Sequence, residues 1–179
     1  APTGVGLGIL PAALHGAART AIVIGLGTGQ TAGWLGATPG IERVDVVEIE
    51  PSMTRVAELC EATNQRALET PRVKLHIADG RELLLVTSEP YDLIVSEPSN
   101  PYRAGIASMY SQDFYRGIAA RLRPGGLLAQ WVQAYEIDAP AVHMVAATLQ
   151  SVLPHVSLWQ LGPGDMVFVA SAGPLIVDV

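Results

Sequence analysis

The chain has 179 residues, enough for one domain with a sizeable core and short for two. Charged residues make up only 16% of the chain, the formal net charge is −6, and Lys and Arg form no run. This balance lacks the electrostatic footprint of a nucleic-acid-binding protein and suits a cationic ligand better. The longest apolar stretches are interrupted, so we expect no membrane span. A single cysteine and four scattered histidines predict neither a disulfide nor a metal site.

The chain starts at Ala1 without an initiator methionine, and we therefore expect a domain excised from a longer parent. We expect one domain over residues 1–179, with a helical lead-in over residues 1–20 and a tail over residues 172–179.

Five strand-then-helix units follow the lead-in. The expected strands are short, apolar and rich in β-branched residues, which is typical of parallel strands buried on both faces. They cover residues 21–25, 44–49, 73–77, 91–96 and 127–132. The expected helices cover residues 31–35, 52–61, 80–86, 112–122 and 138–153. A hairpin over residues 156–160 and 166–170 completes the chain. The pattern predicts a doubly wound, mostly parallel seven-stranded α/β sheet with an antiparallel C-terminal hairpin.

The first strand leads into a glycine-rich turn. Gly25, Gly27 and Gly29 allow sharp turns and close approach of a ligand to the backbone. The spacing lacks the further glycine of a dinucleotide fingerprint and the Lys-Ser/Thr of a phosphate loop. A nucleoside without phosphates therefore fits better, and the alternative is a simple strand-to-helix turn.

Carboxylates follow the second and third strands, at the edge where a doubly wound sheet binds its ligand. Glu48 ends the second strand, where a carboxylate can accept hydrogen bonds from both ribose hydroxyls, with Glu50 as the alternative. Asp79 and Gly80 follow the third strand, where the carboxylate can accept from an adenine amino group. Asp79 can equally be a helix N-cap.

In the loop after the fourth strand, SEPSNP, Glu97 and Asn100 are three residues apart, and each precedes a proline that restricts the backbone. An amine with a pKa near ~10.4 is mostly protonated at neutral pH, so amine attack needs a carboxylate to bind the cation and take its proton. Glu97 is the candidate base. The alternative is a proline-rich loop with a solvated acid.

These motifs together resemble the spermidine/spermine synthase branch of the class I S-adenosylmethionine-dependent methyltransferase fold. The matching segments are VIGLGTG at 23–29, VVEIEP at 46–51, HIADGREL at 76–83, YDLIVSEPSNPYRAGIASMYSQDFY at 91–115 and LRPGGLLAQWVQAY at 122–135. The resemblance implies that the three glycines pass the nucleoside, Glu48 holds the ribose and Asp79 the adenine. Glu97 then stands where the family has its catalytic aspartate.

The resemblance also marks departures. Asn100 and Thr28 occupy positions where typical spermidine synthases have aspartates, and the N-terminal β-hairpin of those enzymes has no counterpart in this sequence. The SEPSNP block most resembles bacterial relatives that are sometimes fused to membrane segments. A homodimer is expected from the resemblance and the high apolar content. The lack of a signal peptide favours the cytoplasm, or the cytoplasmic face of a membrane in a fused parent.

The expected reaction is transfer of an aminopropyl group from decarboxylated S-adenosylmethionine to a small-molecule amine, without a metal. Two alternatives stay open: methyl transfer from S-adenosylmethionine itself, and a catalytically silent nucleoside-binding domain.

Overall fold

Seven strands form one sheet in the order β3-β2-β1-β4-β5-β7-β6. The computed structural model describes residues 2–99, 105–133, 135 and 137–175. The first five strands run parallel, whereas β7 pairs antiparallel with both β5 and β6. Their bounds are β1 Thr20–Ile24, β2 Arg43–Glu48, β3 Val73–Ile77, β4 Tyr91–Ser96, β5 Leu122–Gln133, β6 His155–Gly162 and β7 Asp165–Ser171. The predicted doubly wound sheet with an antiparallel hairpin is confirmed.

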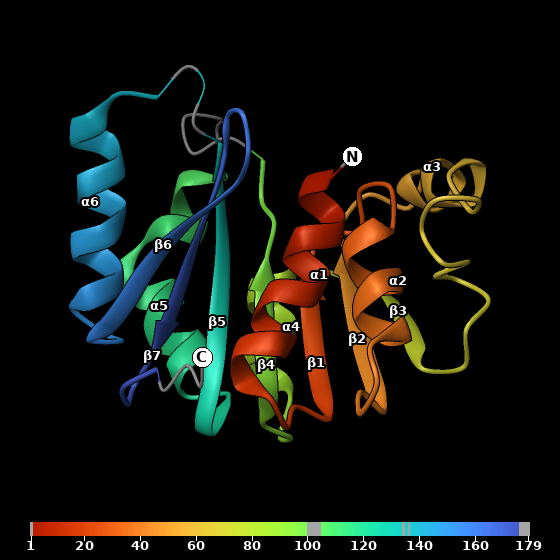
Figure 1. Ribbon diagram of the computed structural model, residues 1–179, viewed down its shortest axis with the longest axis horizontal. Helices are drawn as coiled ribbons and strands as arrows, with labels where there is room; N and C mark the ends of the chain where they lie inside the picture. Colours follow the sequence, from red (N-terminus) through yellow and green to blue (C-terminus); the bar gives the residue numbers. More distant parts are fainter. Residues whose placement is uncertain (1, 100–104, 134, 136, 176–179) are drawn as a thin grey trace.

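Helices cover both faces of the sheet (Figure 1). Their bounds are α1 Pro2–His15, α2 Gln30–Ala37, α3 Met53–Leu59, α4 Gly80–Val86, α5 Gln112–Ala119 and α6 Ala139–Gln150, with a short 3₁₀ helix, η1, at Ala107–Tyr110. Helices α1 and α2 lie in front of the sheet in Figure 1, and α4, α5 and α6 lie behind it.

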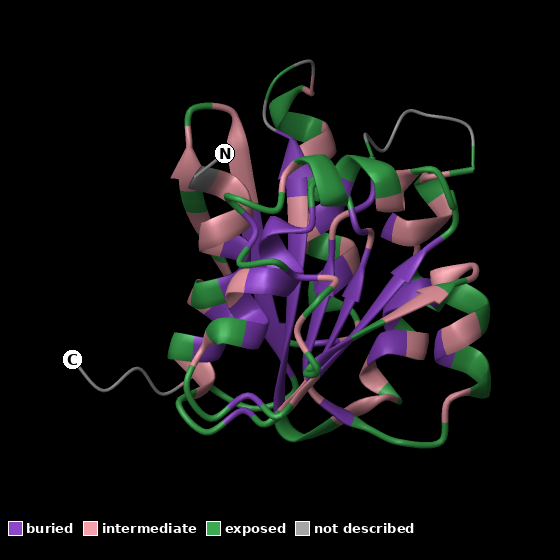
Figure 2. Ribbon diagram, turned by 90° about the vertical axis from the view of Figure 1, so that its right-hand side faces the viewer, coloured by how far each residue is buried: buried purple, intermediate pink, exposed green. Residues whose placement is uncertain are grey.

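Four of the parallel strands, β1, β2, β4 and β5, contribute to two hydrophobic cores because successive side chains point to opposite faces. In β1, Ala21 and Val23 pack toward α1 and α2, and Ile22 and Ile24 pack toward α4, α5 and α6. All four residues are buried, and the strands form the buried layer in Figure 2. This two-sided burial explains why β1 ends in the uninterrupted apolar run Ala21–Ile24.

One boundary was predicted wrongly. The helix expected over residues 112–122 ends at Ala119, and β5 begins at Leu122, before the Pro124-Gly125-Gly126 segment that was expected to precede the strand. The ladder between β4 and β5 shifts register between Tyr91 and Leu93. An irregularity of this kind accommodates proline and a glycine at φ 81°, so the segment lies within the strand.

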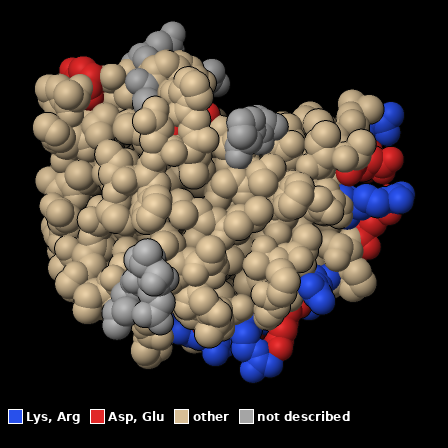
Figure 3. Space-filling model, in the orientation of Figure 1, with Lys and Arg blue, Asp and Glu red and all other residues tan. Residues whose placement is uncertain are grey.

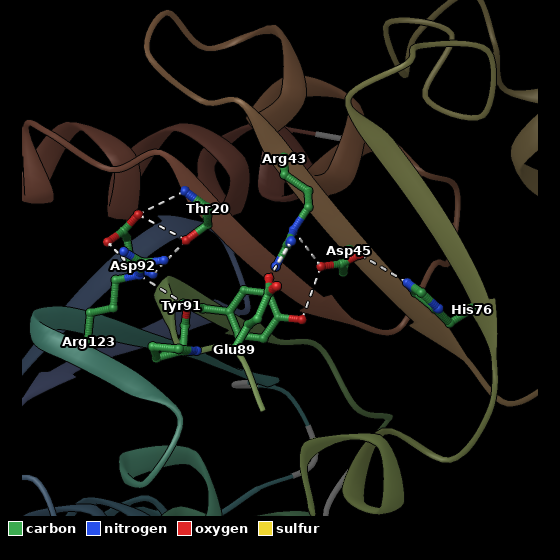
Figure 4. A network of polar contacts seen from close by, with 9 residues as sticks. Thr20, Arg43, Asp45, His76, Glu89, Tyr91, Asp92 and Arg123 are labelled. Atoms are coloured by element: carbon green, nitrogen blue, oxygen red, sulfur yellow. Dashed lines mark hydrogen bonds and ion pairs between the residues drawn. The ribbon is translucent and has the colours of Figure 1, made fainter. Parts of the chain in front are cut away.

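A buried carboxylate connects the strands at the end of the sheet away from their carboxyl termini (Figure 4). Asp45 on β2 accepts a hydrogen bond from the Tyr91 hydroxyl at 3.0 Å and lies 3.0 Å from both Arg43 Nε and His76 Nε2. Glu89 binds Arg43 from the other side at 2.6 Å. These contacts compensate the burial of Asp45, so we assign the cluster a structural role.

The face formed by α1, α2 and β6 carries few charged side chains, and the charges in view gather along one edge (Figure 3). Residues 1–18 and 20–41 contain no Asp, Glu, Lys or Arg. Among the described residues, no helix combines the length and apolar character that crossing a bilayer demands.

Candidate functional site

The carboxyl ends of four neighbouring parallel strands are connected by backbone hydrogen bonds. The amide of Glu97, after β4, donates to Ile24 of β1 at 2.9 Å. The amide of Gly25, after β1, donates to Val47 of β2 at 2.8 Å. These bonds hold the glycine turn and the Glu97 loop at the edge where the strand order reverses, which is the usual ligand position in doubly wound sheets.

A cavity of about 320 Å³ opens at this edge, and we call it the nucleoside-side cavity. The predicted residues Gly25, Glu48, Asp79, Gly80 and Glu97 all line it. The other lining residues are Ile24, Val47, Ile49, Ala78, Arg81, Pro98, Ser99, Gly105, Ile106 and Met109. The wall thus combines an apolar surface with three carboxylates, as a nucleoside requires.

Glu48 is buried, and its carboxylate is fixed by two backbone amides. Leu26 N donates to Oε2 and Glu50 N donates to Oε1, each at 2.9 Å. Each oxygen keeps a lone pair for a further hydrogen bond, so both can accept from adjacent hydroxyls. The carboxylate is therefore preoriented for a ribose, whereas Glu50 does not line the cavity.

The three predicted glycines differ in their position relative to the nucleoside-side cavity. Gly25 has a φ of 104°, and a Cβ there would lie 2.9 Å from the Glu97 carbonyl oxygen. Gly25 alone of the three lines the nucleoside-side cavity. Gly27 lines a different cavity, and Gly29, at φ 76°, begins α2 and packs against Asn64. Only Gly25 of the three thus lies at the cavity that holds Glu48 and Asp79, and a nucleoside role for Gly27 and Gly29 stays a prediction.

Asp79 is the N-cap of α4 and also lies at the nucleoside-side cavity. It caps α4 by accepting from Arg81 N at 2.8 Å. The Arg81 guanidinium donates to Asp79 Oδ2 at 2.6 Å and to Ser108 Oγ at 2.7 Å. The Arg81 side chain lowers the pKa of Asp79, which stays ionised. Arg81, which sequence reasoning missed, thus connects the start of α4 to η1 across the cavity wall.

Glu97 has the most unusual electrostatic environment in the site. Its Oε1 is buried without a hydrogen-bond partner among the described residues. Burial raises the pKa of Glu97 to about 7, and the nearby Thr31 hydroxyl opposes the rise. A carboxyl group with this pKa exchanges its proton near neutral pH, which is what a general base requires.

Glu97 also lines a second cavity, of about 270 Å³, which we call the acceptor-side cavity. Its other lining residues are Thr3, Gly4, Leu7, Leu26, Gly27, Thr28, Gln30, Thr31, Trp131 and Asp165. Sequence reasoning missed this cavity because its wall combines the glycine-rich turn and the start of α2 with α1, β5 and β7, which are far apart in the chain. One signal was available: Asp165 is the only Asp, Glu, Lys or Arg between residues 139 and 177.

Asn100, the other predicted catalytic residue, lies outside the described residues. Within the part of the chain that the structure describes, no three His, Cys, Asp or Glu side chains form a group that could hold a metal ion.

Comparison with known proteins identifies the family. The model of the spermine/spermidine synthase domain matches residues 6–161. This chain belongs to the spermine/spermidine synthase family. The polyamine aminopropyltransferase of Nitrosomonas europaea is 35% identical over 144 residues, which cover 80% of this chain and 44% of the relative. The enzyme of the same name from Alkaliphilus metalliredigens is 30% identical and covers 84% of this chain and 54% of the relative.

Solved structures agree with this family at the level of the fold. A spermidine synthase crystallised with the transition-state analogue AdoDATO has a TM-score of 0.84 at 19% identity, covering 96% of this chain and 61% of that one. Human methyltransferase-like protein 13, in complex with SAH, has a TM-score of 0.73 at 23% identity, covering 96% and 80%. This spermine/spermidine synthase family chain therefore has the methyltransferase-like fold. It spans about half the length of the polyamine aminopropyltransferases that it matches.

Proposed function

We propose that this chain transfers an aminopropyl group from decarboxylated S-adenosylmethionine to an amine. The observation that carries the proposal is the position of Glu97, whose side chain lines both the nucleoside-side and the acceptor-side cavities. A base placed between two cavities is the arrangement that a two-substrate transfer needs. The names of the relatives, polyamine aminopropyltransferases, agree with this reaction.

The donor fits the nucleoside-side cavity through the contacts expected of an adenosyl group. Glu48 would accept from the ribose hydroxyls with the oxygens that Leu26 and Glu50 already orient. Asp79 would accept from the adenine amino group beside the Arg81 guanidinium. Gly25 leaves room for the donor near Glu97, because this position has no side chain.

The chemical step is an in-line displacement. The lone pair of a neutral amine forms a bond to the aminopropyl carbon next to the sulfonium, and the carbon–sulfur bond breaks. Its electron pair stays on sulfur, giving uncharged methylthioadenosine. The new ammonium loses a proton to the Glu97 carboxylate, which balances the reaction. The sulfonium is a good leaving group, so the residues need only orient the substrates and accept a proton.

We also propose a homodimer, which the family resemblance and the high apolar content favour, and a cytoplasmic location, which a small-metabolite donor favours.

Product analysis tests the proposed reaction. The purified protein is incubated with putrescine and either decarboxylated or intact S-adenosylmethionine, and the nucleoside products are separated. We expect methylthioadenosine and an aminopropylated amine from the decarboxylated donor alone. Formation of S-adenosylhomocysteine from the intact donor would instead establish methyl transfer, and binding of either donor without any product would favour a silent nucleoside-binding domain.

A further inference from the structure

Asp165 is a carboxylate fixed in position inside the acceptor-side cavity. It begins β7, directly after the turn of the C-terminal hairpin. The Trp131 indole Nε1 donates to Asp165 Oδ1 at 2.9 Å, and the Thr3 hydroxyl donates to Oδ2 at 2.6 Å. Three separate elements, α1, β5 and β7, therefore meet at this one side chain and hold its orientation.

The two donors that hold Asp165 are both neutral, so they orient the carboxylate without cancelling its charge. Among the described residues, no Lys or Arg forms an ion pair with Asp165, although most other aspartates in the fold have such a partner. A carboxylate has about four lone-pair sites, and two hydrogen bonds leave some of them available. Asp165 can thus accept further hydrogen bonds from a cation in the cavity.

The charge distribution of the acceptor-side cavity favours a ligand with two cationic ends. Among the described residues that line it, only Glu97 and Asp165 are charged, and both are acidic. Glu97 directly follows β4 and Asp165 begins β7, with β5 between the two strands. Adjacent strands are ~4.8 Å apart, so the two backbones are at least about 10 Å apart. A flexible aliphatic chain with an amine at each end can reach both carboxylates from this position.

We propose that Asp165 is the specificity-determining residue that binds the second ammonium group of the acceptor while the first amine faces Glu97. This inference rests on the proposed function, because it assumes that the acceptor-side cavity holds the amine. It assigns to Trp131 and Thr3 the positioning of the Asp165 carboxylate.

The test compares a diamine with a monoamine of the same length. Steady-state rates are measured for putrescine and butylamine, with decarboxylated S-adenosylmethionine as donor, in the unmodified protein and in Asp165→Asn. The matched control is Asp113→Asn, an exposed carboxylate on α5 that lies outside both cavities. We expect Asp165→Asn to raise the KM for putrescine about tenfold or more, and to leave kcat for putrescine and kcat/KM for butylamine within about twofold. Asp113→Asn should change none of these values.

A second variant separates positioning from folding. Trp131→Phe keeps an aromatic ring against the core but removes the indole N–H that holds Asp165. We expect a smaller rise in the KM for putrescine, about two- to fivefold, with no change for butylamine. Equal losses for the two amines in both variants would show that Asp165 only stabilises the fold, and unchanged kinetics for both amines would equally overturn the inference.

A binding measurement keeps this inference distinct from the proposed function. Putrescine is titrated calorimetrically into the unmodified protein and into Asp165→Asn, without a donor. Weaker putrescine binding in Asp165→Asn supports the ammonium site, even if no aminopropyl transfer is detected. In that case the proposed function is wrong but the binding role of Asp165 stands. Equal putrescine affinity in the two proteins would overturn the role of Asp165 whatever the turnover.

Discussion

The backbone amide of Leu26 donates a hydrogen bond of 2.9 Å to the Glu48 carboxylate, so the glycine turn holds the side chain that we assign to the ribose. This bond couples two segments that are 22 residues apart in the chain. It explains why the carboxylate can be buried at the end of β2, since its oxygens are held by backbone donors instead of a counter-ion.

Substitution of Glu48 should weaken donor binding more than it slows the chemical step. Glu48→Gln keeps the size of the side chain but replaces one oxygen with an NH₂ group, which cannot accept from a ribose hydroxyl or from a backbone amide. We expect about a 10- to 100-fold loss of affinity for methylthioadenosine by calorimetry. The control is Glu50→Gln, whose exposed side chain does not line the cavity. Equal effects of the two variants would remove Glu48 from the nucleoside site.

Gly25 should tolerate no side chain. A Cβ at this position would lie 2.9 Å from the Glu97 carbonyl oxygen, on a backbone with φ 104°. We expect Gly25→Ala to destabilise the protein by about 1–3 kcal/mol in urea unfolding and to displace Glu97, abolishing turnover. Gly27→Ala is the comparison for the steric contact, because Gly27 also has a positive φ, of 51°, but a Cβ there meets nothing within 4 Å. Equal stability of Gly25→Ala and the unmodified protein would show that the close approach at Glu97 is not a constraint.

The pH dependence of kcat/KM should reflect the ionisation of the Glu97 carboxyl group. Burial raises the pKa of this carboxyl to about 7, so it is protonated and inactive as a base below that pH. The rate should therefore rise as pH increases through about 7, in addition to the rise caused by deprotonation of the amine itself. Glu97→Asp should retain a rising limb, shifted with the new carboxyl environment. The rates are divided by the fraction of neutral amine at each pH. A corrected profile that is flat from about pH 5.5 to about pH 8 would be incompatible with a Glu97 base.

Glu97 should also reduce stability at alkaline pH. Its pKa is about 7 in the folded protein against an ordinary value of 4.5, so the folded state binds the proton more tightly than the unfolded state does. The contribution of Glu97 should lower the free energy of unfolding as pH rises from 4.5 to about 7. Above about pH 7 this destabilisation should be complete and stay constant. Glu97→Gln removes the charge, and we expect it to be about 1–3 kcal/mol more stable at pH 8 and nearly unchanged at pH 4. Urea unfolding at the two pH values measures this difference.

The sequence predicted the features that depend on neighbouring residues. The apolar runs predicted the parallel strands, because burial on both faces leaves few polar positions in them. The helix starts expected at residues 112 and 138 lie at Ser111 and Asp138, whose side chains cap α5 and α6. Glu48, Asp79 and Glu97 were expected at one edge because parallel strands end at the same edge, and all three line one cavity.

Features that depend on tertiary contacts were not predictable in this way. Arg81 was unremarkable in the sequence, and its importance comes from contacts with Asp79 and with Ser108, which lies 27 residues away. Trp131, Thr3 and Asp165 meet only because α1 and the C-terminal hairpin pack at the same end of the sheet. The orphaned oxygen of Glu97 likewise results from burial by several elements at once.

The most direct test separates binding from turnover in Glu97→Gln. Methylthioadenosine binding is measured by calorimetry, and its release from decarboxylated S-adenosylmethionine and putrescine is measured in the same preparation. We predict that nucleoside affinity stays within about threefold, while turnover falls at least about 100-fold because no carboxylate accepts the proton. Turnover close to that of the unmodified protein would contradict the account, since a base between the two cavities would then be unnecessary for the reaction.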